Sequence, residues 1–128
     1  LARQAGWNAE GTAINPRHCE QHLQGAAIMH LGLTMFEEMI FEEGQLTNGS
    51  LLDYQVASFK DMPEAVKPIV VQVPHQDGPF GAKGAGETGA LTVAPAIANA
   101  IHDACGVRIR DLPITPEKVL RALVEKEK

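Results

Sequence analysis

The sequence feature that most constrains this chain is a run of glycines between residues 78 and 89. Five glycines fall within these twelve residues, together with one carboxylate, that of Glu87. Glycine accepts positive φ and lets the backbone approach another group closely, but a loop so rich in glycine is costly to order. One reason for such a loop is a bulky ligand that lies against the main chain, with Glu87 held beside it.

Three interpretations of this run compete. A flexible turn with a solvated carboxylate is the simplest, because turns concentrate glycine. A phosphate-binding loop is the second, since residues 84–89 match G-x-G-x-x-G; that pattern needs a strand before it, whereas residues 74–79 read PHQDGP. Lys83 is followed by Gly84 rather than Ser or Thr, so the P-loop pattern also fails. The third is an active-site loop that places Glu87 as a general base.

Helical periodicity predicts one long helix over residues 16–43, with Gly44 as its end. Gly25 and Gly32 lie seven residues apart inside this segment, hence on one side, and indicate close packing, of another helix in preference to a ligand. His18 and His22 are four residues apart, as in many zinc sites, but no third ligand is near in sequence. The sequence therefore predicts no metal site held by side chains.

Further helices and several short strands are expected beyond residue 43. Pro95 and Gly106 bound a helix over residues 95–105, and Thr115 begins a last helix with a buried apolar stripe. The expected strands are residues 12–14, 51–59, 69–73 and 107–110, of which 69–73 is the strongest and is expected to be buried on both faces. Without regular alternation of helix and strand, the fold class is α+β, with short mixed strands, one long helix and two shorter ones.

The motifs together point to a known family. The run from Gly78 to Asn99 reads GPFGAKGAGETGALTVAPAIAN, and residues 96–120 read AIANAIHDACGVRIRDLPITPEKVL. With Ile14-Asn15-Pro16, Leu52-Asp53-Tyr54 and Asp61-Met62-Pro63, these stretches closely resemble the C-terminal part of the molybdopterin-binding subunit of the molybdenum hydroxylases. That family includes xanthine dehydrogenase, aldehyde oxidase and the large subunit of carbon monoxide dehydrogenase. The resemblance covers nearly all of the chain after about residue 12 and is specific, which the short G-x-G-E motif alone is not.

The resemblance implies roles for residues of the glycine run. The glutamate that ends the family's G-x-G-E motif is the catalytic base, and it matches Glu87. Gly84, Ala85 and Gly86 then lie against the cofactor, and the position of Ala85 contacts the pterin. The resemblance therefore makes Glu87 the catalytic residue, with the three residues before it as cofactor contacts.

The long helix departs from the family pattern. His22 stands where the family has a glutamine that contacts the cofactor, and imidazole can still donate a hydrogen bond there. Met29 and His30 stand where the family favours glutamine and glycine. His22 is therefore expected to contact the cofactor, while all three departures point to a divergent member.

The activity implied is oxidation of an aldehyde or an N-heterocycle with oxygen from water. The cofactor is a molybdenum–pterin, either molybdopterin or its cytosine dinucleotide form, and iron–sulfur clusters and FAD are expected on partner subunits. Residues 1–128 are then the C-terminal part of a molybdopterin-binding domain, as a fragment or split subunit whose partners are the remainder of that subunit, an iron–sulfur subunit and a flavin subunit. The alternative is a non-catalytic remnant or assembly module without cofactor.

Composition narrows the location and partners. The net charge is −5 with acids and bases interspersed, which argues against binding to nucleic acid or to an anionic membrane. No apolar run approaches the roughly 18 residues of a membrane-spanning helix, and no signal segment opens the sequence. Cys19 and Cys105 are far apart and read as two free thiols of a reducing compartment. A cytoplasmic protein that acts on a small molecule is expected.

Overall fold

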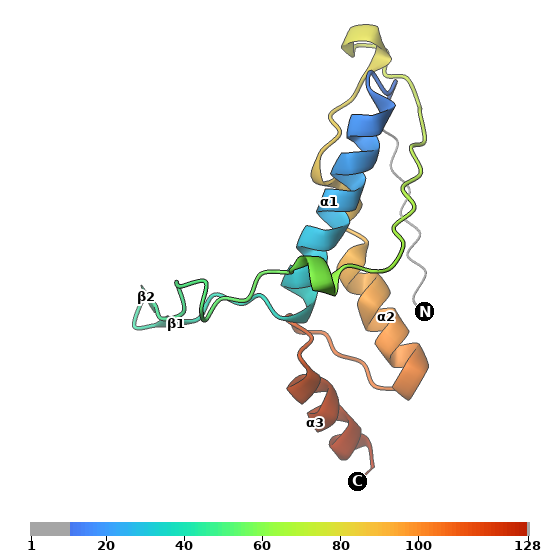
Figure 1. Ribbon diagram of the computed structural model, residues 1–128. Helices are drawn as coiled ribbons and strands as arrows, with labels where there is room; N and C mark the ends of the chain where they lie inside the picture. The colour runs from blue at the N-terminus through green and yellow to red at the C-terminus, as the bar shows by residue number, and fades with distance from the viewer. Residues whose placement is uncertain (1–10, 128) are drawn as a thin grey trace.

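The long helix α1, Pro16–Met35, is the axis of the molecule (Figure 1). The computed structural model describes residues 11–127; residues 1–10 and Lys128 lie outside that range. Helix α2, Val93–Cys105, packs against α1, and helix α3, Pro116–Lys126, extends from their lower end. The two strands are β1, Phe41–Glu42, and β2, Gln45–Leu46. The predicted α+β class, with one long and two shorter helices, is confirmed.

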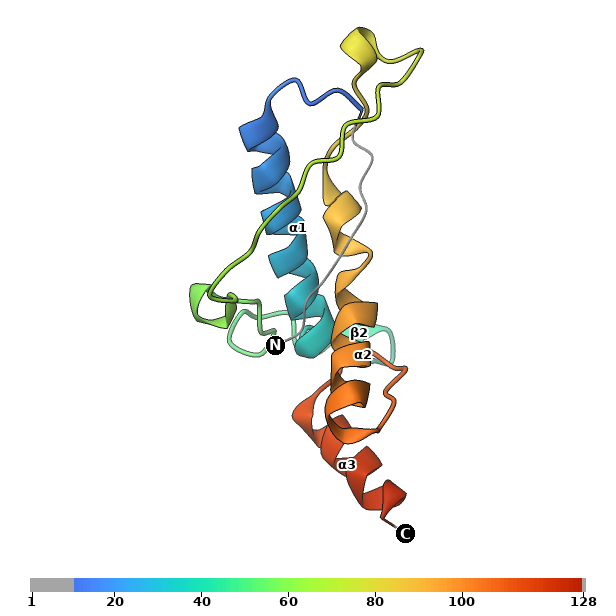
Figure 2. The same ribbon diagram turned by 90° about the vertical axis from the view of Figure 1, so that its right-hand side faces the viewer.

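Three single 3-10 turns lie within the long connections between these elements. They are η1 (Phe59–Asp61), η2 (Pro79–Gly81) and η3 (Glu87–Ala90). Figures 1 and 2 show that the chain leaves α1, makes a side arm with β1 and β2, and returns along α1 as an extended segment that reaches η2 at the top. The glycine-rich run then descends to η3, so that η3 and α2 lie beside α1.

Helix α1 starts where the sequence predicts, but it ends eight residues earlier than expected. Asn15 caps it by accepting a hydrogen bond from the backbone N–H of His18, and Pro16 occupies the first turn. At the other end, the N–H groups of Phe36 and Glu37 both donate to the carbonyl of Gly32, at 3.0 and 2.9 Å. The predicted helix to residue 43 is wrong because acidic residues oppose the dipole at a C-terminus and the later backbone has other partners.

Those other partners come from Asn48. Its Nδ2 donates to the carbonyl of Glu38 at 2.7 Å, and its Oδ1 accepts from the N–H of Ile40 at 2.9 Å. These bonds close a hairpin in which β1 and β2 pair antiparallel across a two-residue turn, with φ of +49° at Glu43 and +81° at Gly44. Two positive φ values in succession define the tight hairpin turn in which glycine is favoured. Gly44 therefore turns a hairpin and does not end a helix, and residues 44–49 are not all loop.

The four strands expected elsewhere do not form ladders. Residues 12–14, 51–59 and 107–110 contain no strand, and residues 69–73 are extended chain with one isolated bridge position, Val71. Ile69 is 74% exposed, so this segment is not buried on both faces in the part of the chain that the structure describes. A β-rich stretch becomes a strand only when a neighbour pairs with it, and periodicity does not say where that neighbour is.

The two shorter helices follow their end signals closely. Helix α2 ends at Gly106, whose φ is +71° and whose N–H donates to the carbonyl of His102 at 2.7 Å. It begins two residues before Pro95, so the expected start at 95 is slightly late. Thr115 caps α3 by accepting from the N–H of Lys118, as predicted. The expected buried stripe of α3 is wrong, because α3 has no buried residue: Val119 and Leu123 are half-buried and Leu120 is 62% exposed.

The core lies where α1 meets η3, α2 and the segment before α3. Ile114 donates its N–H to the carbonyl of Thr34 at 2.6 Å, and both residues are almost fully buried. The other buried apolar residues are Cys19, Leu23, Ala26, Ala90, Val93 and Val107. Both cysteines are free thiols. Within residues 11–127, none of the helices has the length and apolar character needed to cross a membrane.

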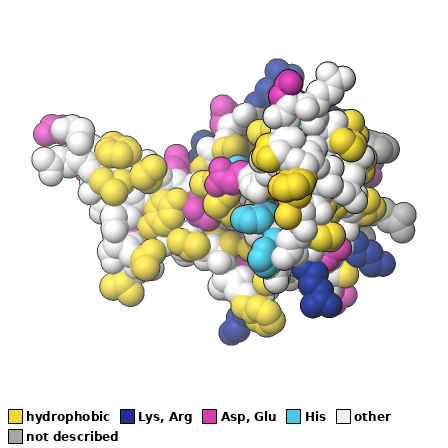
Figure 3. All heavy atoms as spheres, turned by 90° about the horizontal axis from the view of Figure 1, so that it is seen from above, with side chains coloured by type: hydrophobic (Ala, Val, Ile, Leu, Met, Phe, Trp, Pro, Cys, Tyr) yellow, Lys and Arg dark blue, Asp and Glu magenta, His cyan; other side chains and the backbone are white. Residues whose placement is uncertain are grey.

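The side arm carries a cluster of exposed apolar side chains. It comprises residues 39–52 and projects from the body on the left of Figures 1 and 3, where its apolar side chains are yellow. Its exposed large hydrophobic residues are Met39 (61%), Ile40 (48%), Phe41 (59%), Leu46 (43%), Leu51 (81%) and Leu52 (92%).

Candidate cofactor site

A pocket of about 700 Å³ lies between one face of α1 and the turn η3. Its lining residues from α1 are His18, Gln21, His22, Gly25, Ala26 and Met29, and those from the glycine-rich run are Gly86 and Glu87. The volume falls within the range of small-molecule and cofactor pockets, roughly 300–1,000 Å³. The pocket therefore joins the predicted base to the helix that carries the predicted cofactor contact.

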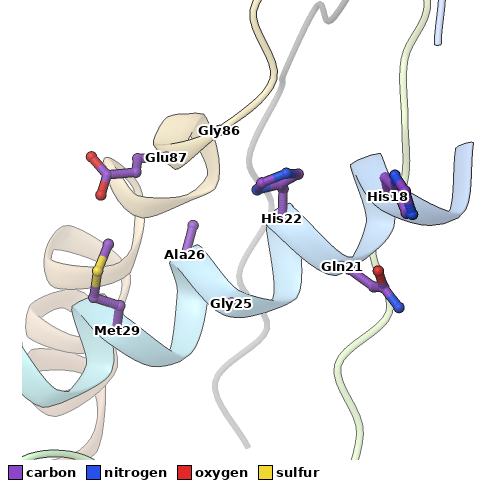
Figure 4. A pocket seen from close by; sticks show the side chains of 8 residues that line it. All are labelled: His18, Gln21, His22, Gly25, Ala26, Met29, Gly86 and Glu87. Carbon is purple, nitrogen blue, oxygen red and sulfur yellow. The ribbon is translucent and has the colours of Figure 1, made fainter. Parts of the chain in front are cut away.

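The α1 side of the pocket is a stripe at helical spacing. His18, His22 and Ala26 are each four residues apart, and Met29 follows three residues later, so all four side chains lie on one face. Figure 4 shows both imidazoles on the same side of α1, with Met29 beyond Ala26 on the side of Glu87. One end of the pocket is thus lined by imidazoles and the other by a methyl and a thioether beside a carboxylate.

Glu87 is the first residue of η3 and is exposed, with its carboxylate above Met29 in Figure 4. Gly89 determines how closely η3 approaches α1. A Cβ on Gly89 would lie 3.2 Å from the carbonyl oxygen of Leu23 and 3.3 Å from Leu23 Cδ2, tighter than ordinary contact. Only a glycine at this position lets the backbone of η3 rest on α1 without displacement, so Gly89 positions the turn that carries Glu87.

The predicted site residues fall into two groups. His22, Gly86 and Glu87 all line the pocket. Gly84 and Ala85 are not among its lining residues, and a Cβ on Gly84 would meet no atom within 4 Å. The structure thus brings together three of the five, and the contacts expected of Gly84 and Ala85 stay predictions.

Sequence reasoning missed the pocket roles of several α1 residues. Gln21 and Ala26 were not singled out, and His18 was considered only as a zinc ligand; the recurrence of His18, His22 and Ala26 at four-residue spacing was the signal available. Met29 was noted only as a departure from the family pattern, and it lines the pocket. His30 does not, and its Nδ1 is buried without a hydrogen-bond partner among the described residues.

Gly25 and Gly32 do not serve the helix packing that their spacing suggested. A Cβ on Gly25 would meet nothing within 4 Å, and the residue lines the pocket. Gly32 makes room for the side chain of Glu37 and lies near Ala57. Of the two alternatives for the glycines of this helix, packing of another helix or contact with a ligand, Gly25 therefore fits contact with a ligand.

Two of the alternative interpretations find no geometric support within residues 11–127. These residues contain no group of three or more His, Cys, Asp or Glu side chains placed to hold a metal ion. Residues 84–89 match the dinucleotide-binding pattern, but no strand precedes them and only the single turn η3 opens within them. The arrangement that the pattern requires, a strand followed by a long helix, is therefore not the one this segment adopts.

The pocket residues fit a bulky, polar heterocyclic cofactor. Added Cβ atoms on Gly25 and Gly86 would meet no atom within 4 Å, so backbone borders open space on both sides of the pocket. Within the described residues, the imidazoles of His18 and His22 have no hydrogen-bond partner, and both residues are exposed. Bare backbone, two exposed imidazoles and one carboxylate therefore border a space that suits such a cofactor.

Comparison with known proteins identifies the cofactor class. The family described as the molybdopterin cofactor-binding domain matches residues 6–63. The probable hypoxanthine oxidase XdhD of Escherichia coli is 40% identical over 114 residues, which is 88% of this chain and 12% of that protein. The gamma subunit of the 6-hydroxypseudooxynicotine dehydrogenase complex of Paenarthrobacter nicotinovorans is 39% identical over 112 residues, 85% of this chain and 14% of that protein.

Solved structures share the fold. Quinoline 2-oxidoreductase from Pseudomonas putida 86 superposes with a TM-score of 0.81 at 32% identity, over 90% of this chain and 15% of that chain. Carbon monoxide dehydrogenase from Oligotropha carboxidovorans superposes with a TM-score of 0.76 at 22% identity, over 91% of this chain and 15% of that chain, which shows the fold alone. The chain belongs to the molybdenum hydroxylase family of molybdopterin-dependent oxidoreductases, and it matches part of the molybdopterin-binding subunit. It spans about one eighth of the length of the first of these relatives.

Proposed function

We propose that this chain supplies the catalytic base and one wall of the cofactor pocket in a molybdenum hydroxylase, with Glu87 as the base. The observation that carries the proposal is the shared pocket. Glu87 and Gly86 from the glycine-rich run, and His22 from α1, line the same 700 Å³ space although they are far apart in sequence. The motif resemblance assigns the base to Glu87 and a cofactor contact to His22, and the geometry makes both roles compatible in one site.

The overall reaction adds oxygen from water to a substrate carbon and releases two electrons and two protons. When bound, the molybdenum–pterin group supplies the redox centre that accepts the electron pair. A carboxylate oxygen of Glu87 accepts one proton as the water-derived oxygen bonds to the carbon. His22 donates a hydrogen bond that orients the cofactor, and the backbone at Gly25 and Gly86 leaves room for it. Iron–sulfur clusters on partner subunits, and FAD in a flavin-containing assembly, would supply the route by which the electrons leave.

The names of the relatives support a proposal for the substrate class. The similar proteins are named for hypoxanthine and quinoline, which are N-heterocycles, and for aldehydes. We therefore propose an N-heterocycle or an aldehyde as the substrate of the complete enzyme. The remainder of the molybdopterin subunit and an iron–sulfur subunit are the proposed partners.

The test is the Glu87→Gln variant of the complete enzyme. Amide cannot accept the proton, so turnover should fall by about 10²–10⁴-fold while the molybdenum content stays at the wild-type level. Glu20→Gln is the matched control, because Glu20 is an exposed acid on α1 that does not line the pocket. Near-normal turnover of the Glu87→Gln enzyme would remove Glu87 from the mechanism.

A second candidate is a non-catalytic assembly module. The observation that favours it is that His22 and Met29 line the pocket where the family pattern has glutamines. Metal analysis of the assembled protein separates the two candidates. Stoichiometric molybdenum supports the enzyme, whereas a stable assembly with no molybdenum after expression in a cofactor-producing host supports the module.

A further inference from the structure

We propose that His18, which the motif resemblance leaves without a role, is a second cofactor contact that holds the heteroaromatic end of the pterin, away from the reacting centre. The proposal deepens the function above and rests on it. It starts from the difference in chemistry between the two ends of the pocket.

The reacting end of the pocket is fixed by Glu87. Turn η3 rests on α1 at Leu23, where the bare Cα of Gly89 permits close approach. Glu87 therefore stands over the part of α1 that carries Ala26 and Met29, as Figure 4 shows. The side chains of Ala26 and Met29 have no strong hydrogen-bonding group, so this end suits an oxidisable carbon beside a base and not the polar edge of a heterocycle.

The other end of the pocket continues beyond His22 by one helical turn. His18 is about 6 Å from His22 along the axis of α1 and about 16 Å from Met29, at 1.5 Å per residue. Both imidazoles project from the same side of α1 in Figure 4. The pocket lined by α1 is therefore longer than the segment between the base and His22, and its extra length is bordered by a ring that has no protein partner within the described residues.

The chemistry of imidazole matches that of a pterin edge. A neutral imidazole offers one donor and one acceptor and presents a flat aromatic face. A pterin carries ring nitrogens, a carbonyl and an amine along its edge, together with a planar ring that stacks. Two imidazoles one turn apart can therefore contact the same heterocycle at two points, which fixes its direction in the pocket with the metal end toward Glu87.

The test measures retention of cofactor as well as turnover. In the complete enzyme, His18→Ala should lose pterin and molybdenum about two- to tenfold faster on dialysis, which is the effect of one lost neutral hydrogen bond. Turnover is measured per bound molybdenum, so that loss of cofactor is separated from any change in the chemistry. His18→Gln, which keeps a donor and an acceptor, should restore part of the retention. His102→Ala is the matched control, an exposed histidine on α2 that does not line the pocket.

The outcomes separate this proposal from the one on which it rests. Wild-type retention in His18→Ala overturns the role of His18 and leaves Glu87 as the base. A raised KM for the organic substrate at unchanged retention also overturns it, because His18 would then touch substrate and not cofactor. A wild-type assembly that contains no molybdenum overturns the proposed function as well.

Discussion

The hydroxyl of Tyr54 donates a hydrogen bond to Glu37 Oε2 at 2.8 Å and so ties the turn after the side arm to the end of α1. The contact depends on Gly32, because a Cβ there would collide with the other carboxylate oxygen of Glu37. The pKa of Tyr54 is raised from its ordinary value of 10.0, first by this hydrogen bond and also by desolvation and by the negative charge of Glu37. The contact that holds the chain after the arm to the end of α1 therefore contains a titratable group, the hydroxyl of Tyr54.

The titration of Tyr54 can be followed directly because Tyr54 is the only tyrosine in the chain. In Glu37→Gln the charge and the strong acceptor are lost, so the pKa of Tyr54 should fall toward 10.0. A tyrosine whose folded-state pKa is raised contributes stability below its ordinary pKa, and that contribution is lost as the pH rises through the raised value. Ultraviolet difference titration measures the shift, and Glu38→Gln is the control. Equal titration curves for the wild type and Glu37→Gln would show that the contact is absent in solution.

Gly89→Ala should loosen the turn that carries Glu87. The added Cβ would press on the carbonyl oxygen and Cδ2 of Leu23, and such overpacking costs about 1–3 kcal/mol. The free energy of unfolding should fall by that amount, measured by denaturant titration of the variant and wild type under the same conditions. Gly84→Ala is the control for folding, because its Cβ meets no atom within 4 Å. A Gly89→Ala protein as stable as the control would contradict the close seating of η3 on α1.

Two substitutions at Gly25 separate its effect on helix stability from its effect on cofactor binding. Alanine is a better helix former by about 1 kcal/mol, and the added Cβ meets no atom, so Gly25→Ala should raise the stability of α1. Gly25→Leu places a long side chain into the pocket, and the molybdenum content of the complete enzyme should fall severalfold. Metal analysis and thermal unfolding of both variants check the pair. Full molybdenum loading of Gly25→Leu would mean that the cofactor does not occupy this space.

Asp61 provides a prediction at acid pH. Its Oδ2 accepts from the hydroxyl of Ser58 at 2.6 Å and from the N–H of Ser58 at 2.7 Å. These bonds hold the pKa of Asp61 below its ordinary value of 3.8, the hydroxyl contributing most. A lowered carboxyl pKa stabilises the fold above the ordinary value, and that contribution is lost as the pH falls through the lowered one.

The measurement is an NMR titration of the Asp61 carboxyl group. Ser58→Ala removes the hydroxyl and keeps the N–H, so the pKa of Asp61 should rise part of the way to 3.8. Ser50→Ala, in the same connection, is the matched control, because the Ser50 hydroxyl accepts from the N–H of Leu52. An unchanged titration midpoint for Asp61 in Ser58→Ala would exclude the hydrogen bond from the Ser58 hydroxyl.

Local signals predicted the helix boundaries that depend on local chemistry. Asn15-Pro16, Thr115-Pro116 and Gly106 act within one turn of the chain, and all three were located correctly. The end of α1 was missed because Asn48, ten residues beyond Glu38, provides the bonds that replace the helix. Competition of this kind between distant partners is not visible in periodicity.

In the site as well, the sequence indicated individual residues but not how distant segments pack together. Glu87 and His22 were assigned through motif resemblance, and the pocket that unites them depends on how η3 seats on α1 at Leu23. His18 was available as a four-residue repeat but suggested zinc, since spacing alone does not distinguish a metal from a heterocycle. For Met29, the sequence indicated only a departure from the family pattern and not a place in the pocket.

The projecting hairpin has a practical consequence for anyone who produces these residues by themselves. Six large hydrophobic side chains are exposed on the arm. Among the described residues, its two short strands pair only with each other, so the outer edge of each strand can pair with another chain. Molecules with such an arm should aggregate at the concentrations used for structural work, and polar replacements at Leu51 and Leu52 should keep the sample monodisperse.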